Sequence, residues 1–179
     1  MAIDFPQRAP TLVGSSIVLR QLDELVLDVY EELVGDPDVA MWTSSTATYT
    51  REQLLDWLTT RAGSPNRLDW AIFQSQVFVG EIVLNEFDAE SQTMNLRIAL
   101  LPSQSSKGFG SQAVKLVSDF AFEVLGLERL TLDVLPHNQR AIRSYLKSGF
   151  EKHDELIESG VVFDLMELRA AKHKRITLP

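Results

Sequence analysis

The stretch from Leu96 to Phe150 constrains the fold of this chain more than any other part of the sequence. It predicts a strand over 96–101, a glycine-rich loop over 102–110, an amphipathic helix, a second strand over 129–135 and a second helix. The first helix has apolar residues three to four positions apart, at Phe109, Ala113, Val117, Phe120, Ala121 and Val124. Gly126 follows this periodic run and is typical of a helix end.

The rest of the chain contributes mainly strands. A first strand is predicted over 16–22, and further strands over 68–73, 77–87, 93–101 and 161–168, with a short strand after Phe150. The 179 residues are enough for one domain with a real core and too few for two ordinary ones, so we expect a single domain over 1–179. The mixed order predicts an α+β or three-layer α/β fold, with a mostly antiparallel sheet flanked by helices.

Three helical segments are predicted before residue 63. Asp23 is a good N-cap for a helix that extends to Leu33 and that Gly35-Asp36-Pro37 stops, and a short helical turn follows over 39–42. Thr50 with Gln53 resembles a capping box, and the helix it opens extends to about Ala62. At the other end of the chain, 172–175 is a basic run that we expect to be a solvated end.

The composition excludes several classes of function. The chain has no cysteine, which excludes disulfides, cysteine–zinc sites and cysteine nucleophiles, and we expect no metal. The net charge of −8 disfavours nucleic acid as a partner. No apolar run approaches the roughly 20 residues of a membrane span, and Met1–Pro6 lacks the pattern of a signal peptide, so we expect a cytoplasmic protein without a membrane partner.

The glycines at the start of the first helix predict an anion site. The first N–H groups of a helix have no partner within it, and the macrodipole adds partial positive charge there. Gly108 and Gly110 allow a pyrophosphate to approach the backbone closely. The same residues fit a dinucleotide fingerprint, with Asp133 near the position of a ribose-binding acid. The strand, however, ends near Leu101, and six residues separate it from the first glycine, whereas the fingerprint needs a tight turn directly after the strand.

A second motif follows in the same stretch. Asn138, Ala141, Tyr145 and Gly149-Phe150 are spaced so that Ala141 and Tyr145 share one face of a helix that begins at Asn138. This helix also carries Arg140, Arg143 and Lys147 and no acid, a basic surface suited to phosphates.

With these two motifs the chain resembles the GNAT superfamily of acyl-CoA-dependent N-acyltransferases, and within it the RimJ/RimL branch. The resemblance covers nearly the whole chain, and it is carried mainly by Lys107-Gly108-Phe109-Gly110 and by the spacing from Asn138 to Phe150. It implies a GNAT-type fold, acetyl-CoA as the cofactor, and transfer of an acetyl group to a primary amine, on a protein N-terminus or a small molecule.

The resemblance also implies site residues. Tyr145 is the expected general acid for the leaving thiolate, and Glu81 is the candidate base. Trp42, Tyr49, Trp57 and Trp70 are candidates to shape the acceptor pocket. The expected cofactor contacts are Ile98, Ala99 and Leu100 for the pantetheine arm, the loop residues Ser105, Ser106, Lys107, Gly108, Phe109, Gly110 and Ser111 for the pyrophosphate, Asn138 for the arm, and Arg143.

Two positions depart from the family pattern. Ser105 and Ser106 replace the usual Gln or Arg and Gly, and Asn95 stands where many relatives have a glutamate. These departures keep open a non-catalytic acyl-CoA-binding or regulatory domain. A nicotinamide-dependent oxidoreductase is the weakest alternative, and the sequence leaves the acceptor and a homodimer open.

Overall fold

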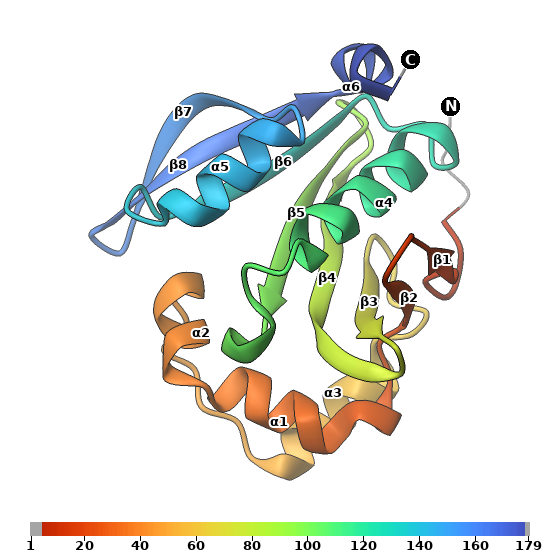
Figure 1. Cartoon of the computed structure of the whole chain (residues 1–179), viewed down its shortest axis with the longest axis vertical. Helices are drawn as coiled ribbons and strands as arrows, with labels where there is room; N and C mark the ends of the chain where they lie inside the picture. The colour runs from red at the N-terminus through yellow and green to blue at the C-terminus, as the bar shows by residue number, and fades with distance from the viewer. Residues whose placement is uncertain (1–4, 178–179) are drawn as a thin grey trace.

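The computed structural model describes residues 5–177 and contains one eight-stranded sheet in the order β1-β2-β3-β4-β5-β6-β8-β7 (Figure 1). The expectation for the first residues, Met1 to Asp4, therefore lies outside the described part. All neighbouring strands are antiparallel except β5 and β6. The strands are β1 Leu12–Val13, β2 Val18–Gln21, β3 Leu68–Gln74, β4 Val77–Asp88, β5 Thr93–Leu100, β6 Arg129–Val134, β7 Glu151–Glu158 and β8 Val161–Arg169.

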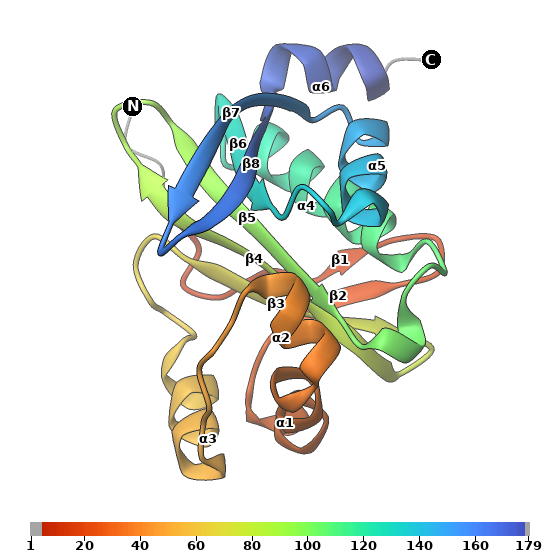
Figure 2. The ribbon, with the colours of Figure 1, turned by 90° about the vertical axis from the view of Figure 1, so that its left-hand side faces the viewer.

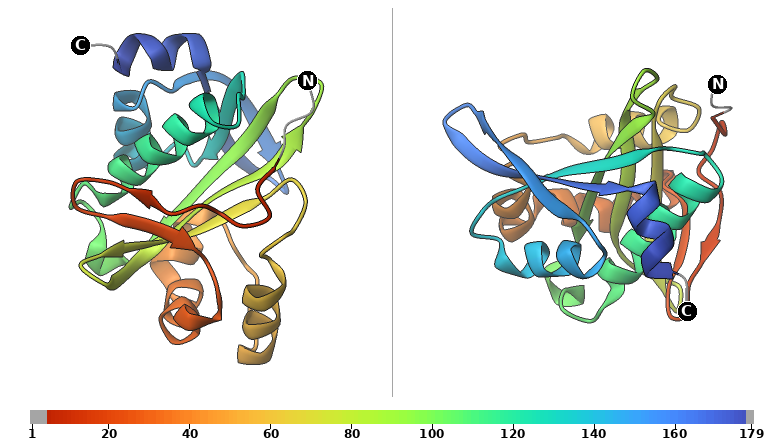
Figure 3. Two further views of the ribbon diagram at one scale, coloured as in Figure 1. Left: turned by 90° about the vertical axis from the view of Figure 1, so that its right-hand side faces the viewer. Right: turned by 90° about the horizontal axis from the view of Figure 1, so that it is seen from above.

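Helices cover both faces of this sheet, which confirms the predicted mixed, three-layer architecture (Figures 2 and 3). On one face α4 packs through its apolar stripe, and on the other α1 and α3 pack against Ala71 and Phe78. The helices are α1 Leu27–Gly35, α2 Pro37–Thr43, α3 Arg51–Thr60, α4 Phe109–Glu123, α5 Gln139–Lys147 and α6 Ala170–Thr177, with short 3-10 turns at Glu24–Val26 and Pro102–Gln104. No helix among the described residues is both long and apolar enough to cross a bilayer.

Strands β5 and β6 form the only parallel pair within the described chain, and they separate soon after it begins. Their register runs through three pairs and ends at Asn95 with Thr131. Beyond this point β5 continues to Leu100 and β6 to Val134 without pairing with each other, although β5 still pairs with β4 and β6 with β8. The two strand ends therefore diverge, and the facing edge of β5 is left without a strand partner.

Local signals place most helix starts correctly. The capping box at Thr50 is present, since Gln53 N donates to Thr50 Oγ1 and Thr50 N donates to Gln53 Oε1. The helical turn expected over 39–42 is a longer helix that begins at Pro37, because Asp36 caps it and proline is tolerated in the first turn.

The expectation of a solvated basic end was wrong at His173. Residues 172–175 lie in α6, and His173 is only 4% exposed. Its Nε2 lies 2.6 Å from Asp119 Oδ1, and its ring centroid lies 5.0 Å from that of Phe122 on α4. The long-range contact to α4 overrides the polar composition of the segment, and the side chains of Lys174 and Arg175 lie outside the described part.

A glycine on β4 permits the close approach of β5. A Cβ at Gly80 would lie 2.2 Å from the carbonyl oxygen of Ala99 and 2.8 Å from Leu100 Cα. We expect Gly80→Ala to destabilise the protein by about 1–3 kcal/mol, because backbone atoms must move to admit the methyl group. Thermal unfolding measures this. The matched control is Gly35→Ala, where a Cβ meets nothing within 4 Å, and an equal midpoint for both variants would contradict the prediction.

Candidate active site

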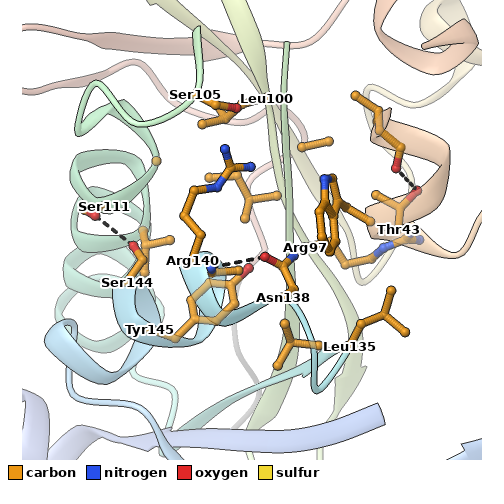
Figure 4. Close-up of a pocket in the computed structure, with 18 of the residues that line it drawn as sticks. Thr43, Arg97, Leu100, Ser105, Ser111, Leu135, Asn138, Arg140, Ser144 and Tyr145 are labelled. Carbon is orange, nitrogen blue, oxygen red and sulfur yellow. Dashed lines mark hydrogen bonds between the residues drawn. The ribbon is translucent and has the colours of Figure 1, made fainter. Parts of the chain in front are cut away.

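A cavity of about 600 Å³ opens where β5 and β6 diverge (Figure 4). Its walls come from α2, β5, the loop before α4, the start of α4, the end of β6, α5 and β8. The lining residues are Asp38, Val39, Trp42, Thr43, Leu96, Arg97, Ile98, Ala99, Leu100, Pro102, Ser105, Ser106, Gly108, Gly110, Ser111, Val114, Asp133, Val134, Leu135, Asn138, Arg140, Ala141, Ser144, Tyr145 and Phe163.

The glycine-rich loop forms one end of this cavity. Gly108 is the N-cap of α4 and has a φ of 83°, a left-handed conformation that residues with a Cβ rarely adopt. No side chain caps the helix. The free N–H groups of the first turn are therefore available to an anion. The predicted loop residues Ser105, Ser106, Gly108, Gly110 and Ser111 all line the cavity.

Two predicted loop contacts do not line the cavity. Lys107 Nζ instead donates to Gln104 Oε1 at 3.0 Å, and Phe109 packs against the hydrophobic core. The charge and the apolar ring of these residues therefore stabilise the loop from outside the cavity.

The predicted segment of β5 lines the cavity and alternates between two sides. A Cβ at Gly110 would lie 3.2 Å from Leu100 Cδ1 and 3.7 Å from Ile98 Cδ1, so these two side chains face the start of α4. Ala99 packs instead with the cluster of α1 and α3 on the opposite face. Between these two faces of β5 lies the strand edge that faces β6, which has no strand partner beyond Asn95.

Helix α5 presents one face to the cavity, with Arg140, Ala141, Ser144 and Tyr145. Asn138 caps the helix, and its Oδ1 accepts from the backbone N of Ala141 at 3.2 Å. Tyr145 is partly buried, with its ring centroid 5.9 Å from that of Phe150. Burial and the nearby charge of Asp133 raise the pKa of Tyr145 well above its usual value. The phenol therefore keeps its proton at neutral pH.

Of the three basic residues predicted on this helix, Arg140 reaches the cavity. Arg140 lines the cavity, whereas Arg143 is exposed and does not. Helix α5 begins at Gln139, so Arg140 lies in its first turn. Arg140 lines the same cavity as the loop before α4. Nearby, the hydroxyls of Ser111 and Ser144 are 2.7 Å apart and join α4 to α5 (Figure 4).

Glu81 is not among the lining residues. It lies on β4, and its carboxylate accepts a hydrogen bond of 3.0 Å from the hydroxyl of Tyr30 on α1. Burial raises the pKa of Glu81 to about 6, and the hydrogen bond from Tyr30 partly opposes this shift. A catalytic role for Glu81 stays a prediction.

The raised pKa of Glu81 predicts a pH-dependent stability. Above pH 6 the folded protein holds a buried carboxylate, and between pH 6 and 4.5 it takes up a proton that the unfolded chain does not. Glu81→Gln should therefore stabilise the protein at pH 7 by up to about 2 kcal/mol, an advantage that is lost as the pH falls toward 4.5. Denaturant unfolding measures this. Glu86→Gln, at an exposed position on β4, controls for the loss of a carboxylate, and a stability difference that does not vary with pH would contradict the assignment.

Of the four aromatic candidates for the acceptor pocket, only Trp42 lines the cavity. Its ring centroid lies 5.5 Å from that of His137, in the loop before α5. Trp57 stacks on Tyr30, Trp70 is fully buried, and Tyr49 is 53% exposed away from the cavity. Sequence reasoning did not predict Asp38 or Arg97 as cavity residues, it named Arg140 only as part of the basic surface of its helix, and it considered Asp133 only for a nucleotide ribose. The alternation along each strand separates Arg97 and Asp133 from their buried neighbours, but only the pairing of β5 with β6 puts the two residues on one face.

Comparisons with known proteins agree with this geometry. The model of the acetyltransferase (GNAT) domain matches residues 16–151. The chain is 25% identical over 147 residues to the uncharacterized N-acetyltransferase p20 of Bacillus licheniformis, covering 79% of this chain and 83% of that protein. It is 35% identical over 78 residues to the spermidine N(1)-acetyltransferase of Escherichia coli K12, covering 44% and 42%.

Solved structures show the same fold. A spermidine N-acetyltransferase from Vibrio cholerae, in complex with CoA and spermine, superposes with a TM-score of 0.83 at 18% identity, covering 90% of this chain and 99% of that one. A GNAT-family acetyltransferase from Bacillus anthracis gives 0.79 at 16% identity, covering 90% and 99%. The family match extends from before β2 to the start of β7 and so includes every strand and helix that lines the cavity except β8. The chain therefore belongs to the acetyltransferase (GNAT) domain family.

Proposed function

We propose that this protein transfers the acetyl group of acetyl-CoA to a primary amine, on a protein N-terminus or a small molecule. The observation that carries the proposal is one continuous cavity that joins the uncapped start of α4 to the phenol of Tyr145. The family membership supports acetyl transfer, and the complex of the Vibrio cholerae enzyme with CoA supports the cofactor. The RimJ/RimL branch stays a prediction, since the named relatives include spermidine N-acetyltransferases.

The residues that line the cavity fit acetyl-CoA. The first-turn N–H groups of α4, with the hydroxyls of Ser105 and Ser106, would hold the pyrophosphate, and Arg140 would add a positive charge. The β6-side edge of β5 has no strand partner beyond Asn95 and would pair with the pantetheine amides. Asn138, the N-cap of α5, lines the wall of the cavity opposite β5 and is the predicted partner of the pantetheine arm.

Bound acetyl-CoA supplies an activated acyl carbon with a thiolate as leaving group. The neutral amine would form a C–N bond to this carbon as the C–S bond breaks, and the nitrogen would give up one proton to water, which restores the proton that Tyr145 donates in the same reaction. Tyr145 holds its proton at neutral pH and can donate it to the departing sulfur, so the products are the amide and CoA with a free thiol. Before attack the acceptor ammonium must lose a proton, and the candidate acceptors are Glu81, a water held by Asn85 or Asn95, and solvent. Glu81 does not line the cavity, so a proton would reach it through water.

Release of free thiol from acetyl-CoA tests the proposal. We expect thiol release that depends on an added amine, across a panel of N-terminal peptides, amino acids and polyamines, with the acetylated product identified by mass. Calorimetric binding of CoA without thiol release from any amine would instead support a non-catalytic acyl-CoA-binding domain.

A further inference from the structure

We propose that the acceptor is an amine that also carries a free carboxylate, as an α-amino acid does, with Arg97 binding its carboxylate and Asp133 its ammonium group. This inference rests on the proposed function and names the substrate class of the same cavity. It is carried by the placement of Arg97 and Asp133 on one side of the diverging strands.

Arg97 faces away from the phosphate end of the cavity. Ile98 and Leu100 point toward Gly110 at the start of α4, and side chains alternate along a strand, so Arg97 shares the opposite side with Ala99. Helix α2 lies on that side, because Val39 packs with the cluster that contains Ala99. Figure 4 shows Arg140 near Ser111 and Ser144, and Arg97 toward Thr43 of α2.

Asp133 lies on the same side as Arg97. Leu132 and Val134 are buried in the core under α4, so Asp133 between them points to the other face. The parallel register pairs Asn95 with Thr131, and Arg97 and Asp133 are each two residues further along. They therefore face the same space at the same level, across the gap between the strands.

The neighbours of these two residues distinguish their roles. Asp133 and Tyr145 both line the cavity, and the charge of Asp133 adds to the effect of burial in raising the pKa of the phenol, so this carboxylate lies on the side of the cavity where the reaction would occur. An ammonium held there would be next to the group that protonates the leaving sulfur. Arg97 is exposed within the cavity and has no hydrogen bond or ion pair within the described part of the chain.

The guanidinium of Arg97 favours an acceptor with a negative group. Arginine binds carboxylates in a bidentate manner, and such bonds are about twice as strong as neutral ones. Glu81, on the same face, feels the charge of Arg97, but its carboxylate is held by Tyr30. Asp38 of α2 also lines this side and adds one negative charge. A polyamine would bring a second cation close to Arg97, at an electrostatic cost that an amino acid does not incur.

Apolar side chains complete this side of the cavity. Val39 and Trp42 of α2 and Phe163 of β8 line it and would accommodate an apolar or aromatic side chain of the acceptor.

Matched acceptors test the inference. Phenylalanine, phenylalanine amide and phenethylamine differ only in the carboxylate, as do leucine, leucine amide and isopentylamine, and spermidine serves as the polyamine. We expect kcat/KM for the free amino acid to exceed that for the amide and the decarboxylated amine at least about tenfold. Arg97→Gln should remove this preference through KM and leave CoA affinity unchanged. Arg8→Gln, at an exposed position outside the cavity, is the control.

A second readout does not depend on turnover. Calorimetry on the complex with CoA should show tighter binding of N-acetylphenylalanine than of N-acetylphenethylamine, and equal binding in Arg97→Gln. Turnover of spermidine or the decarboxylated amines in preference to amino acids would overturn the inference and leave the proposed function standing. Absence of thiol release with every acceptor would instead reject the proposed function.

Discussion

Tyr145→Phe is expected to lower kcat about 10²- to 10³-fold while the affinity for CoA stays within about twofold. The hydroxyl is the only group removed, and the remaining ring keeps its packing against Phe150 and the core. Because burial and Asp133 raise the pKa of the phenol, it is protonated throughout the neutral range and can act as the acid. The thiolate would leave the variant without a proton donor.

Steady-state kinetics with acetyl-CoA and calorimetry with CoA separate the two effects. Tyr49→Phe is the matched control, since Tyr49 is 53% exposed and lies outside the cavity. Equal turnover of Tyr145→Phe and wild type would remove Tyr145 from the acid role. A parallel loss of CoA affinity would assign the hydroxyl to binding.

Gly110→Val is expected to raise the Kd for CoA about 10- to 100-fold, since overpacking a filled site costs roughly 1–3 kcal/mol. A Cβ at this position already lies 3.2 Å from Leu100 Cδ1, so the valine methyls must extend into the cavity where the first turn of α4 opens. They would stand between an incoming pyrophosphate and the backbone N–H groups.

Calorimetry with CoA measures this loss, and thermal unfolding reports whether the variant folds. Gly35→Val is the matched control, because Gly35 lies at the end of α1 and has open space around it. A folded Gly110→Val protein with wild-type affinity would refute the assignment of the loop to phosphate binding.

Several parts of the site could be predicted from the sequence because their signals are local. The glycines before α4, the cap at Asn138 and the spacing from Ala141 to Tyr145 each involve residues within one or two turns of each other. The order of strands and helices follows from the same short-range patterns, and it led to the mixed sheet with helices on both faces.

Other parts depend on contacts between distant segments. The composition of residues 172–175 predicts a polar, solvated end, but the ring of His173 contacts Asp119 on α4, which is 54 positions away in the sequence. Arg143 and Arg140 are equally basic in the sequence, and only the direction of α5 against α4 decides which one lines the cavity.

The sequence by itself determined the glycine-rich loop before α4, the helix that carries Tyr145 and the class of fold, because neighbouring residues encode turns, caps and periodicity. Only the tertiary structure decided which side chains share the cavity. The early separation of β5 from β6 opens it, the hydrogen bond from Tyr30 holds Glu81 outside it, and the common register brings Arg97 and Asp133 to one side. These outcomes depend on contacts between segments more than 30 residues apart in the sequence, which no local pattern specifies.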